Sequence, residues 1–286
     1  MDVHAFFDPA TWTLTYVVVD PTSRDAVVID SVLDFDPATG RVGHTSIDGL
    51  LAWVAERQLT VRATLETHAH ADHWSGAATL RDRLGIPVVI GAGIRRVQAT
   101  FAPVFGLADT LPTDGSQFDV LAEDGQVLRF GTIEVTALST PGHTPACVTW
   151  KIGDALFTGD ALFMPDSGVG RCDFPGGSAE TLYDAIVGKL YALPEPTRVF
   201  VGHDYQPGGR ALAYETTIGA SKAGNVQLPA SRSRDEFVAA RVARDRTLAP
   251  PRLLFYSIQV NLAAGRLPAP TADGRRFLVQ PLTVVE

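Results

Sequence analysis

The stretch Thr67-His68-Ala69-His70-Ala71-Asp72-His73 decides how the rest of this chain can be arranged. It ends a run of β-branched and apolar residues, 61–67, that predicts a buried strand, and it leads into a predicted helix over 75–84. Three imidazoles and a carboxylate this close together, at the end of a buried strand, would stay unsatisfied unless a cation lay between them. The stretch therefore predicts a metal site.

Three more potential ligands follow later in the chain, each after an apolar run that ends in a turn. They are His143 in 140–144, Asp160 in 157–161 and His203 in 201–205. A single buried histidine is more often a hydrogen-bonded core residue, and an isolated Asp72 or Asp160 would suit a helix cap or a turn. Because five of the seven histidines fall in these motifs, the metal-site interpretation is favoured.

The pattern H-x-H-x-D-H, followed by His, Asp and His at strand ends, resembles the hallmark of the metallo-β-lactamase superfamily. The resemblance implies a mixed α/β (α+β) fold, the four-layer αββα sandwich, in which ligands come from both halves. We therefore expect residues 1–286 to form a single domain, with 209–286 as a C-terminal helical segment and tail packed on it.

Hydrophobic periodicity predicts most elements of this fold directly. Strands at 12–20 and 25–30 are expected to form an opening hairpin, and Ser46 is expected to cap a helix that contains Ile47, Leu50 and Val54. Further strands are expected at 87–91, 126–130, 133–138, 147–152, 155–158 and 198–202, and helices at 93–105, after Ser178, after Gly208-Gly209 and at 253–263.

The composition of the chain limits its expected binding partners and its expected cellular compartment. A formal net charge of -8 without a basic stripe argues against nucleic acid as the main partner. No stretch approaches the roughly 18 apolar residues of a membrane span, and the first residues resemble no signal peptide. Two cysteines, Cys147 and Cys172, make no disulfide framework, and Cys172 is expected to be a buried thiol rather than a nucleophile. We expect a cytoplasmic protein.

Imidazole and carboxylate donors without a thiolate suit zinc, iron or manganese. Two metals could bind, the first to His68, His70 and His143 and the second to Asp72, His73 and His203, with Asp160 between them. A single iron could instead bind His68, His143 and Asp160, which leaves three positions open, while His70, Asp72, His73 and His203 orient the ligands through hydrogen bonds. Ligand counting leaves both arrangements open.

The flanking segments 140–149, 157–166, 170–177 and 202–205 resemble those of the persulfide dioxygenases of this superfamily. The resemblance implies one Fe2+ per chain and the oxidation of glutathione persulfide by O2 to sulfite and glutathione. The alternative is a hydroxyacylglutathione hydrolase with two Zn2+ per chain, related to glyoxalase II. Enzymes of that type usually carry Thr and Glu where this chain has Ala161 and Asp204. A non-catalytic protein that binds metal or thiols is the third possibility.

Substrate contacts are also implied by the resemblance. Arg171 lies in a glycine-rich loop that this family uses to hold the carboxylate of a glutathione moiety, a group that suits a guanidinium fork. Tyr205 and Arg210 are candidates of the same kind. The apolar C-terminal stretch could pack on the core or on a second copy, so a homodimer is possible.

Overall fold

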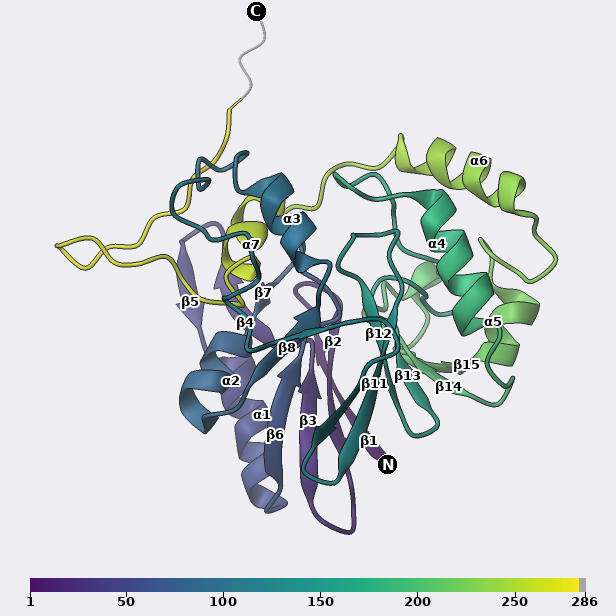
Figure 1. Cartoon of the computed structure of the whole chain (residues 1–286), viewed down its shortest axis with the longest axis horizontal. Coiled ribbons are helices and arrows are strands. Elements are labelled where there is room, and N and C mark those ends of the chain that lie inside the picture. Colours follow the sequence, from purple (N-terminus) through teal and green to yellow (C-terminus); the bar gives the residue numbers. More distant parts are fainter. Residues whose placement is uncertain (283–286) are drawn as a thin grey trace, which may run out of the picture.

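Two six-stranded sheets, packed face to face, form the centre of the molecule (Figure 1). The computed structural model describes residues 1–282. The first sheet has the order β1 (Asp2–Asp8), β2 (Thr13–Val19), β3 (Asp25–Ile29), β6 (Thr60–Leu65), β8 (Val88–Gly91) and β9 (Val120–Ala122). The second has the order β10 (Val127–Phe130), β11 (Ile133–Ser139), β12 (Val148–Ile152), β13 (Ala155–Phe157), β14 (Arg198–Phe200) and β15 (Glu215–Thr217).

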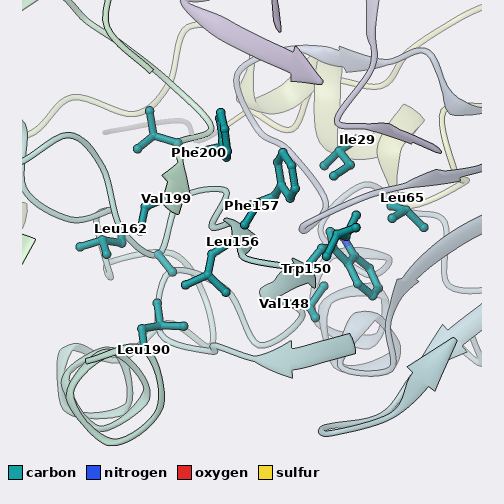
Figure 2. Packing of buried hydrophobic residues seen from close by; sticks show 14 of the residues in the cluster. Ile29, Leu65, Val148, Trp150, Leu156, Phe157, Leu162, Leu190, Val199 and Phe200 are labelled. Atoms are coloured by element: carbon teal, nitrogen blue, oxygen red, sulfur yellow. The ribbon is translucent and has the colours of Figure 1, made fainter. Parts of the chain in front are cut away.

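Alternation along the strands decides which side chains lie between the sheets. In β2, Leu14, Tyr16 and Val18 pack in the central core, whereas Val17 and Val19 pack on the opposite face, under α1. Side chains of successive strand residues point to opposite faces, so a run that is apolar at every position predicts a sheet covered on both sides. Figure 2 shows part of this core, in which Phe157 and Phe200 lie side by side; their rings stack with centroids 5.1 Å apart.

Helices cover both outer faces, which gives the four layers. On the side of the first sheet lie α1 (Thr45–Glu56), α2 (Ala77–Leu84) and α3 (Ile94–Phe101) (Figure 1). On the side of the second lie α4 (Ala179–Ala185), which continues into a π-helical turn at Ile186–Leu190, α5 (Ile218–Gly224) and α6 (Arg234–Asp245). A small third sheet contains β5 (Arg41–Gly43), β4 (Val32–Asp36) and β7 (Trp74–Ser75). The expected αββα sandwich is confirmed.

The predicted cap of the first helix is wrong. α1 begins at Thr45, and the capping position belongs to His44, whose side chain makes no capping hydrogen bond. Ser46 lies inside the first turn, where both its backbone N–H and its hydroxyl donate to the carboxylate of Asp34 on β4. A carboxylate from a neighbouring strand therefore satisfies this helix N-terminus, which a local pattern cannot reveal. The Ser178 cap of α4 is confirmed, since its hydroxyl accepts from Thr181 N.

The last helix returns from the second half of the chain to the first. After α6 the chain crosses to α7 (Leu254–Asn261), where Ile258 and Leu262 pack against Ala69 and Ala71 of the histidine-rich stretch (Figure 1). α7 therefore supports the metal-site loop from the side opposite the central core.

Candidate metal centre

Strand ends deliver the predicted ligands to one place. β3 and β6 are parallel and adjacent, so Asp30 and the 67–73 loop leave the same edge of the first sheet. β13 and β14 are parallel in the second sheet, so Asp160 and His203 leave its corresponding edge together. Such edges, where connecting loops meet, are where layered α/β folds keep their chemistry.

His68, His143 and Asp160 form the first group of donors. One donor atom from each lies within 4.8 Å of the other two, and all three side chains are buried. His143 Nε2 lies 3.4 Å from Asp160 Oδ2. Two imidazoles and one carboxylate on one face are the arrangement predicted for a single iron.

Hydrogen bonds fix the imidazole tautomers of this group. Thr67 Oγ1 donates to Asp30 Oδ2 at 2.8 Å and therefore accepts from His68 Nδ1 at 3.0 Å. His143 Nδ1 donates to the carbonyl of Arg171 at 2.7 Å. Both rings thus carry their proton on Nδ1 and present the lone pair of Nε2 to the site, as metal-binding histidines do. Burial, reinforced by the neighbouring His70, holds the pKa of His68 well below its usual value, which favours the neutral form that binds metal.

His70, Asp72, His73 and His203 form the second group, with one donor atom each within 4.8 Å of the others. His203 Nε2 lies 3.3 Å from Asp72 Oδ2, and His73 Nδ1 lies 3.4 Å from the same oxygen. The two-metal arrangement predicted from the sequence places His70 with His68 and His143, whose nearest ring centroid, that of His68, lies 4.1 Å from that of His70, and this assignment stays a prediction. His70 Nε2 faces Asp30 at 3.1 Å, which orients its Nδ1 toward the second group.

Asp160 connects the two groups. Its Oδ2 faces His143, whereas its Oδ1 lies 3.3 Å from His203 Nε2. Burial would lower the pKa of His203, but the nearby Asp72 and Asp160 carboxylates outweigh it and raise that pKa above its usual value. Burial would likewise raise the pKa of Asp72, yet His203 and His73 hold it well below the usual range. His203 therefore holds its proton more tightly than a free imidazole does, and Asp72 releases its proton more readily than a free carboxyl does.

Unsatisfied buried atoms test whether a cation fits. Among residues 1–282, four donor atoms of the two groups are buried without any hydrogen-bond partner: His68 Nε2, His70 Nδ1, His73 Nε2 and Asp160 Oδ1. Leaving buried polar atoms unpaired costs on the order of 1–3 kcal/mol each. A cation in the first group would satisfy His68 Nε2, and one in the second group would satisfy His70 Nδ1 and His73 Nε2, so the residues fit metal binding.

The motif alone did not reveal the groups that surround the ligands. Asp30 and Glu66 are buried behind His70, within 3.1 and 3.6 Å of its Nε2. Asn261 of α7 donates to the carbonyls of His70 and His73, both at 2.8 Å, and accepts from Ser75 N at 2.9 Å. An acid directly after a buried strand, as at Asp30, is a usable sequence signal, whereas nothing in the sequence marks Asn261.

Gly159 shows why the loops can approach so closely. Its φ is +48°, and a Cβ atom there would lie 2.3 Å from Thr67 Oγ1. The loop after β13 therefore touches the residue that orients His68, and only glycine lets the backbone come this close. A larger residue would push the two sheet edges apart.

A cavity of about 260 Å3 opens onto the first group. His143, Asp160 and Asp72 line its floor, and its walls are formed mostly by apolar and aromatic side chains with two arginines: Ala10, Thr11, Trp12, Ala71, Arg171, Phe174, Tyr205, Pro251, Arg252 and Leu253. Of the three predicted substrate contacts, Arg171 and Tyr205 therefore face this cavity.

Arg210 is not brought to the cavity. Its guanidinium pairs with Asp166, at 2.5 Å from Nε, and with the fully buried Asp204, at 2.7 Å from Nη2. Arg210 thus ties two loops together. Two carboxylates from its own surroundings occupy its donors, and its contact with a substrate stays a prediction.

Comparison with known proteins agrees with this geometry. Residues 13–203 match the Metallo-beta-lactamase superfamily, and all seven donors lie within that range. The chain belongs to the metallo-β-lactamase superfamily. A metal is therefore the expected occupant of the site.

Relatives within the metallo-β-lactamase superfamily carry different functional names. A probable metallo-hydrolase from Burkholderia pseudomallei is 46% identical over the whole of both chains. Glyoxylase B2 of Dictyostelium discoideum is 43% identical and covers 94% of this chain and 93% of its own. The mitochondrial persulfide dioxygenase ETHE1 of Homo sapiens is 31% identical, with 93% of this chain and 89% of the human protein covered.

The superfamily fold recurs in a solved structure. The crystal structure of ETHE1 from Myxococcus xanthus matches with a TM-score of 0.74 and 32% identity, over 93% of this chain and all of the other. The chain spans only 65% of the length of a β-lactamase hydrolase-like protein from Xylella fastidiosa, to which it is 47% identical. No helix within residues 1–282 is long and apolar enough to cross a bilayer.

Proposed function

We propose that this protein is a persulfide dioxygenase that uses one Fe2+, held by His68, His143 and Asp160, to oxidise glutathione persulfide with O2 to sulfite and glutathione. The observation that carries the proposal is the two-histidine, one-carboxylate group, of which His143 and Asp160 line the cavity. Iron(II) bound there would supply open positions at which oxygen and a sulfur substrate can meet. The likeness to the persulfide dioxygenase named above supports the same assignment.

The protein's own residues would orient and shield the reaction. Trp12, Phe174 and Leu253 line the cavity and exclude water from the terminal sulfur of the persulfide. Tyr205 stacks on His203, with ring centroids 5.6 Å apart, and so holds that imidazole beside Asp160. We assign His70, Asp72, His73 and His203 to the support of this site through hydrogen bonds and charge.

The reaction balances without an external reductant. Glutathione persulfide, O2 and one water give glutathione, sulfite and two protons. The terminal sulfur is oxidised, both atoms of O2 are reduced, and the sulfur–sulfur bond breaks by hydrolysis. Because the substrate supplies all electrons, no electron-transfer partner is required.

The test combines metal analysis with oxygen uptake on freshly purified protein. The proposal expects about one iron per chain, and oxygen consumption with glutathione persulfide that yields sulfite in equal amount. Protein stripped by a chelator should regain the activity with Fe2+ and not with Zn2+. Protein fully loaded with iron that consumes no oxygen with this substrate would contradict the proposal.

A second candidate is a hydroxyacylglutathione hydrolase with two Zn2+. One specific observation favours it, namely that the two oxygens of Asp160 face the two groups of donors separately, as a bridging carboxylate would. Relatives with hydrolase and glyoxylase names favour it as well. Two zinc ions per chain together with cleavage of S-lactoylglutathione would support the hydrolase, and the absence of both would exclude it.

A further inference from the structure

Two arginines, Arg171 and Arg252, line the cavity. They differ in whether their guanidinium groups are already paired with another residue of the chain. Arg171 donates from Nε and Nη2 to the two oxygens of Asp173, at 2.6 and 2.7 Å, and from Nη1 to the carbonyl of Ala249 at 2.8 Å. This bidentate pair is the strongest common arrangement of an arginine with a carboxylate. A substrate carboxylate would have to compete with Asp173 for Arg171.

Arg252 is the other cation. Within residues 1–282 its guanidinium makes no hydrogen bond and no ion pair, and it is exposed at the cavity. Asp36 is the acid whose charge it influences, but that carboxylate already accepts from Thr39 Oγ1 at 2.6 Å and from Ala38 N at 2.9 Å. All five N–H donors of Arg252 are therefore available to a ligand.

The backbone on both sides of Arg252 is held in place. Pro251 precedes it and lines the same cavity, while Leu253 follows it, is 3% exposed and occupies the capping position just before α7. Proline fixes one backbone angle, and a buried leucine anchors the other side. The guanidinium is thus presented to the cavity from a fixed point, so that binding through it loses little backbone entropy.

Two large aromatic side chains stand open at the same cavity. Trp12 is 45% exposed and Tyr205 is 50% exposed, with ring centroids 6.2 Å apart. Trp12 has a φ of +56°, a strained conformation for a residue with a side chain. Open aromatic faces at the same cavity as an unpaired guanidinium suit a ligand whose body can pack flat on the rings and whose end is anionic.

We propose that Arg252 is the residue that recognises the carrier part of the substrate, by binding a carboxylate of the thiol carrier while its peptide body packs on Trp12 and Tyr205. The inference rests on the proposed function for the identity of the carrier, glutathione. It moves the specificity contact from Arg171 to Arg252, and Arg171 then acts as a structural partner of Asp173.

Binding of an unreactive analogue tests this separately from catalysis. Isothermal titration calorimetry would measure S-methylglutathione, and its diethyl ester, on the metal-loaded protein and on three variants. We expect Arg252→Ala to weaken binding of the acid about tenfold, as loss of a charge-assisted hydrogen bond does. Arg252→Lys should fall between, because it keeps the charge and loses the fork. Arg246→Ala, an exposed arginine outside the cavity, is the matched control and should bind as the wild type does.

The diethyl ester tests whether Arg252 and the ligand carboxylates interact directly. Esterification should weaken binding to the wild type about as much as Arg252→Ala does, and should have no further effect in that variant. Binding of the acid by Arg252→Ala within about twofold of the wild type would overturn the inference, as would a wild type that does not distinguish acid from ester or does not bind the acid. Oxygen uptake with glutathione persulfide, measured in parallel, reports on the proposed function alone, so either idea can fail without the other.

Discussion

His68 and His203 belong to different groups of donors, and removing each should separate the two proposed metal arrangements. His68→Ala deletes a ligand of the iron and should lower the iron content to near zero. His203→Ala removes a neighbour of Asp160 and should leave about one iron per chain, with an affinity reduced roughly tenfold, as is usual for a residue that only supports a ligand. Metal analysis after dialysis measures both. Equal loss of metal in the two variants would contradict the mononuclear assignment.

The pKa values of these two histidines predict a stepwise loss of zinc on acidification. Burial lowers the pKa of His68, so protons compete with metal there only well below about pH 6.5. Asp72 and Asp160 more than offset burial and raise the pKa of His203, so protons compete there from above that pH. Protein loaded with two zinc ions should therefore release the second before the first as pH falls from about 8 to about 6. Equilibrium dialysis followed by zinc analysis checks the order, and simultaneous release would refute it.

The two thiols should be inert in the folded protein. Burial raises the pKa of Cys147 to about 12, and burial together with Asp245 raises that of Cys172 as well. Because the thiolate is the reactive form, a disulfide reagent at about pH 8 should modify neither cysteine within minutes, and both after unfolding. Rapid modification of Cys172 in the native state would reopen its role as a nucleophile.

At the scale of elements, α7 controls the geometry of the histidine loop through one amide. Asn261→Ala would leave the carbonyls of His70 and His73 and the N–H of Ser75 without their partner, at a cost of roughly 1–3 kcal/mol in unfolding free energy. We expect weaker metal binding in addition to lower stability. Urea unfolding and a competition assay with a chelator measure the two effects.

Gln259 on the same helix provides the control for Asn261. Its side-chain amide donates to the carbonyl of Val279 at 2.7 Å and accepts from the N–H of Val279 at 2.9 Å. These bonds hold the C-terminal tail and do not involve the histidine loop. Gln259→Ala should lower stability without changing metal affinity. If the two variants affect metal binding equally, the effect of Asn261 is a general loosening of α7 and not a local one.

For the whole molecule, we predict that a chain without α7 cannot hold metal. A chain ended after Thr247 lacks α7, so Ile258 and Leu262 would no longer cover Ala69 and Ala71. This variant should bind a hydrophobic dye and retain little metal. A chain ended after Pro268 keeps α7 and should stay loaded and folded. Metal retention by the shorter chain would contradict the expectation that residues 1–286 form a single domain.

Local sequence patterns predict the turns, caps and motifs that depend only on residues close together in the chain. Pro21 and its neighbours predict the hairpin between β2 and β3, which is confirmed, as is the Ser178 cap. The histidine motif predicts the donors because a metal requires that chemistry. β1 shows no clear alternation, since six of its seven residues are only half-buried, and it escaped prediction.

Other features depend on tertiary contacts that no local pattern carries. His70 turns toward the second group because Asp30, forty positions earlier in the chain, faces its Nε2. Arg210 forms an ion pair with Asp166 of a different loop. A residue that the sequence suggests as a substrate contact therefore links two loops. Arg252 is proposed as the carboxylate-binding residue only because the guanidinium of Arg171 is already paired with Asp173. In each case, pairing between side chains decides the role of a residue type that is otherwise ambiguous.

The bonds from Asn261 to the histidine loop also affect the order in which the protein can be made. All seven donors have been synthesised by residue 203, but the amide that sets two of their carbonyls arrives 58 residues later. A nascent chain on the ribosome thus carries an incomplete cage until its final stretch emerges. Tight metal binding is therefore expected only once Asn261 has been synthesised and α7 has packed on the histidine loop.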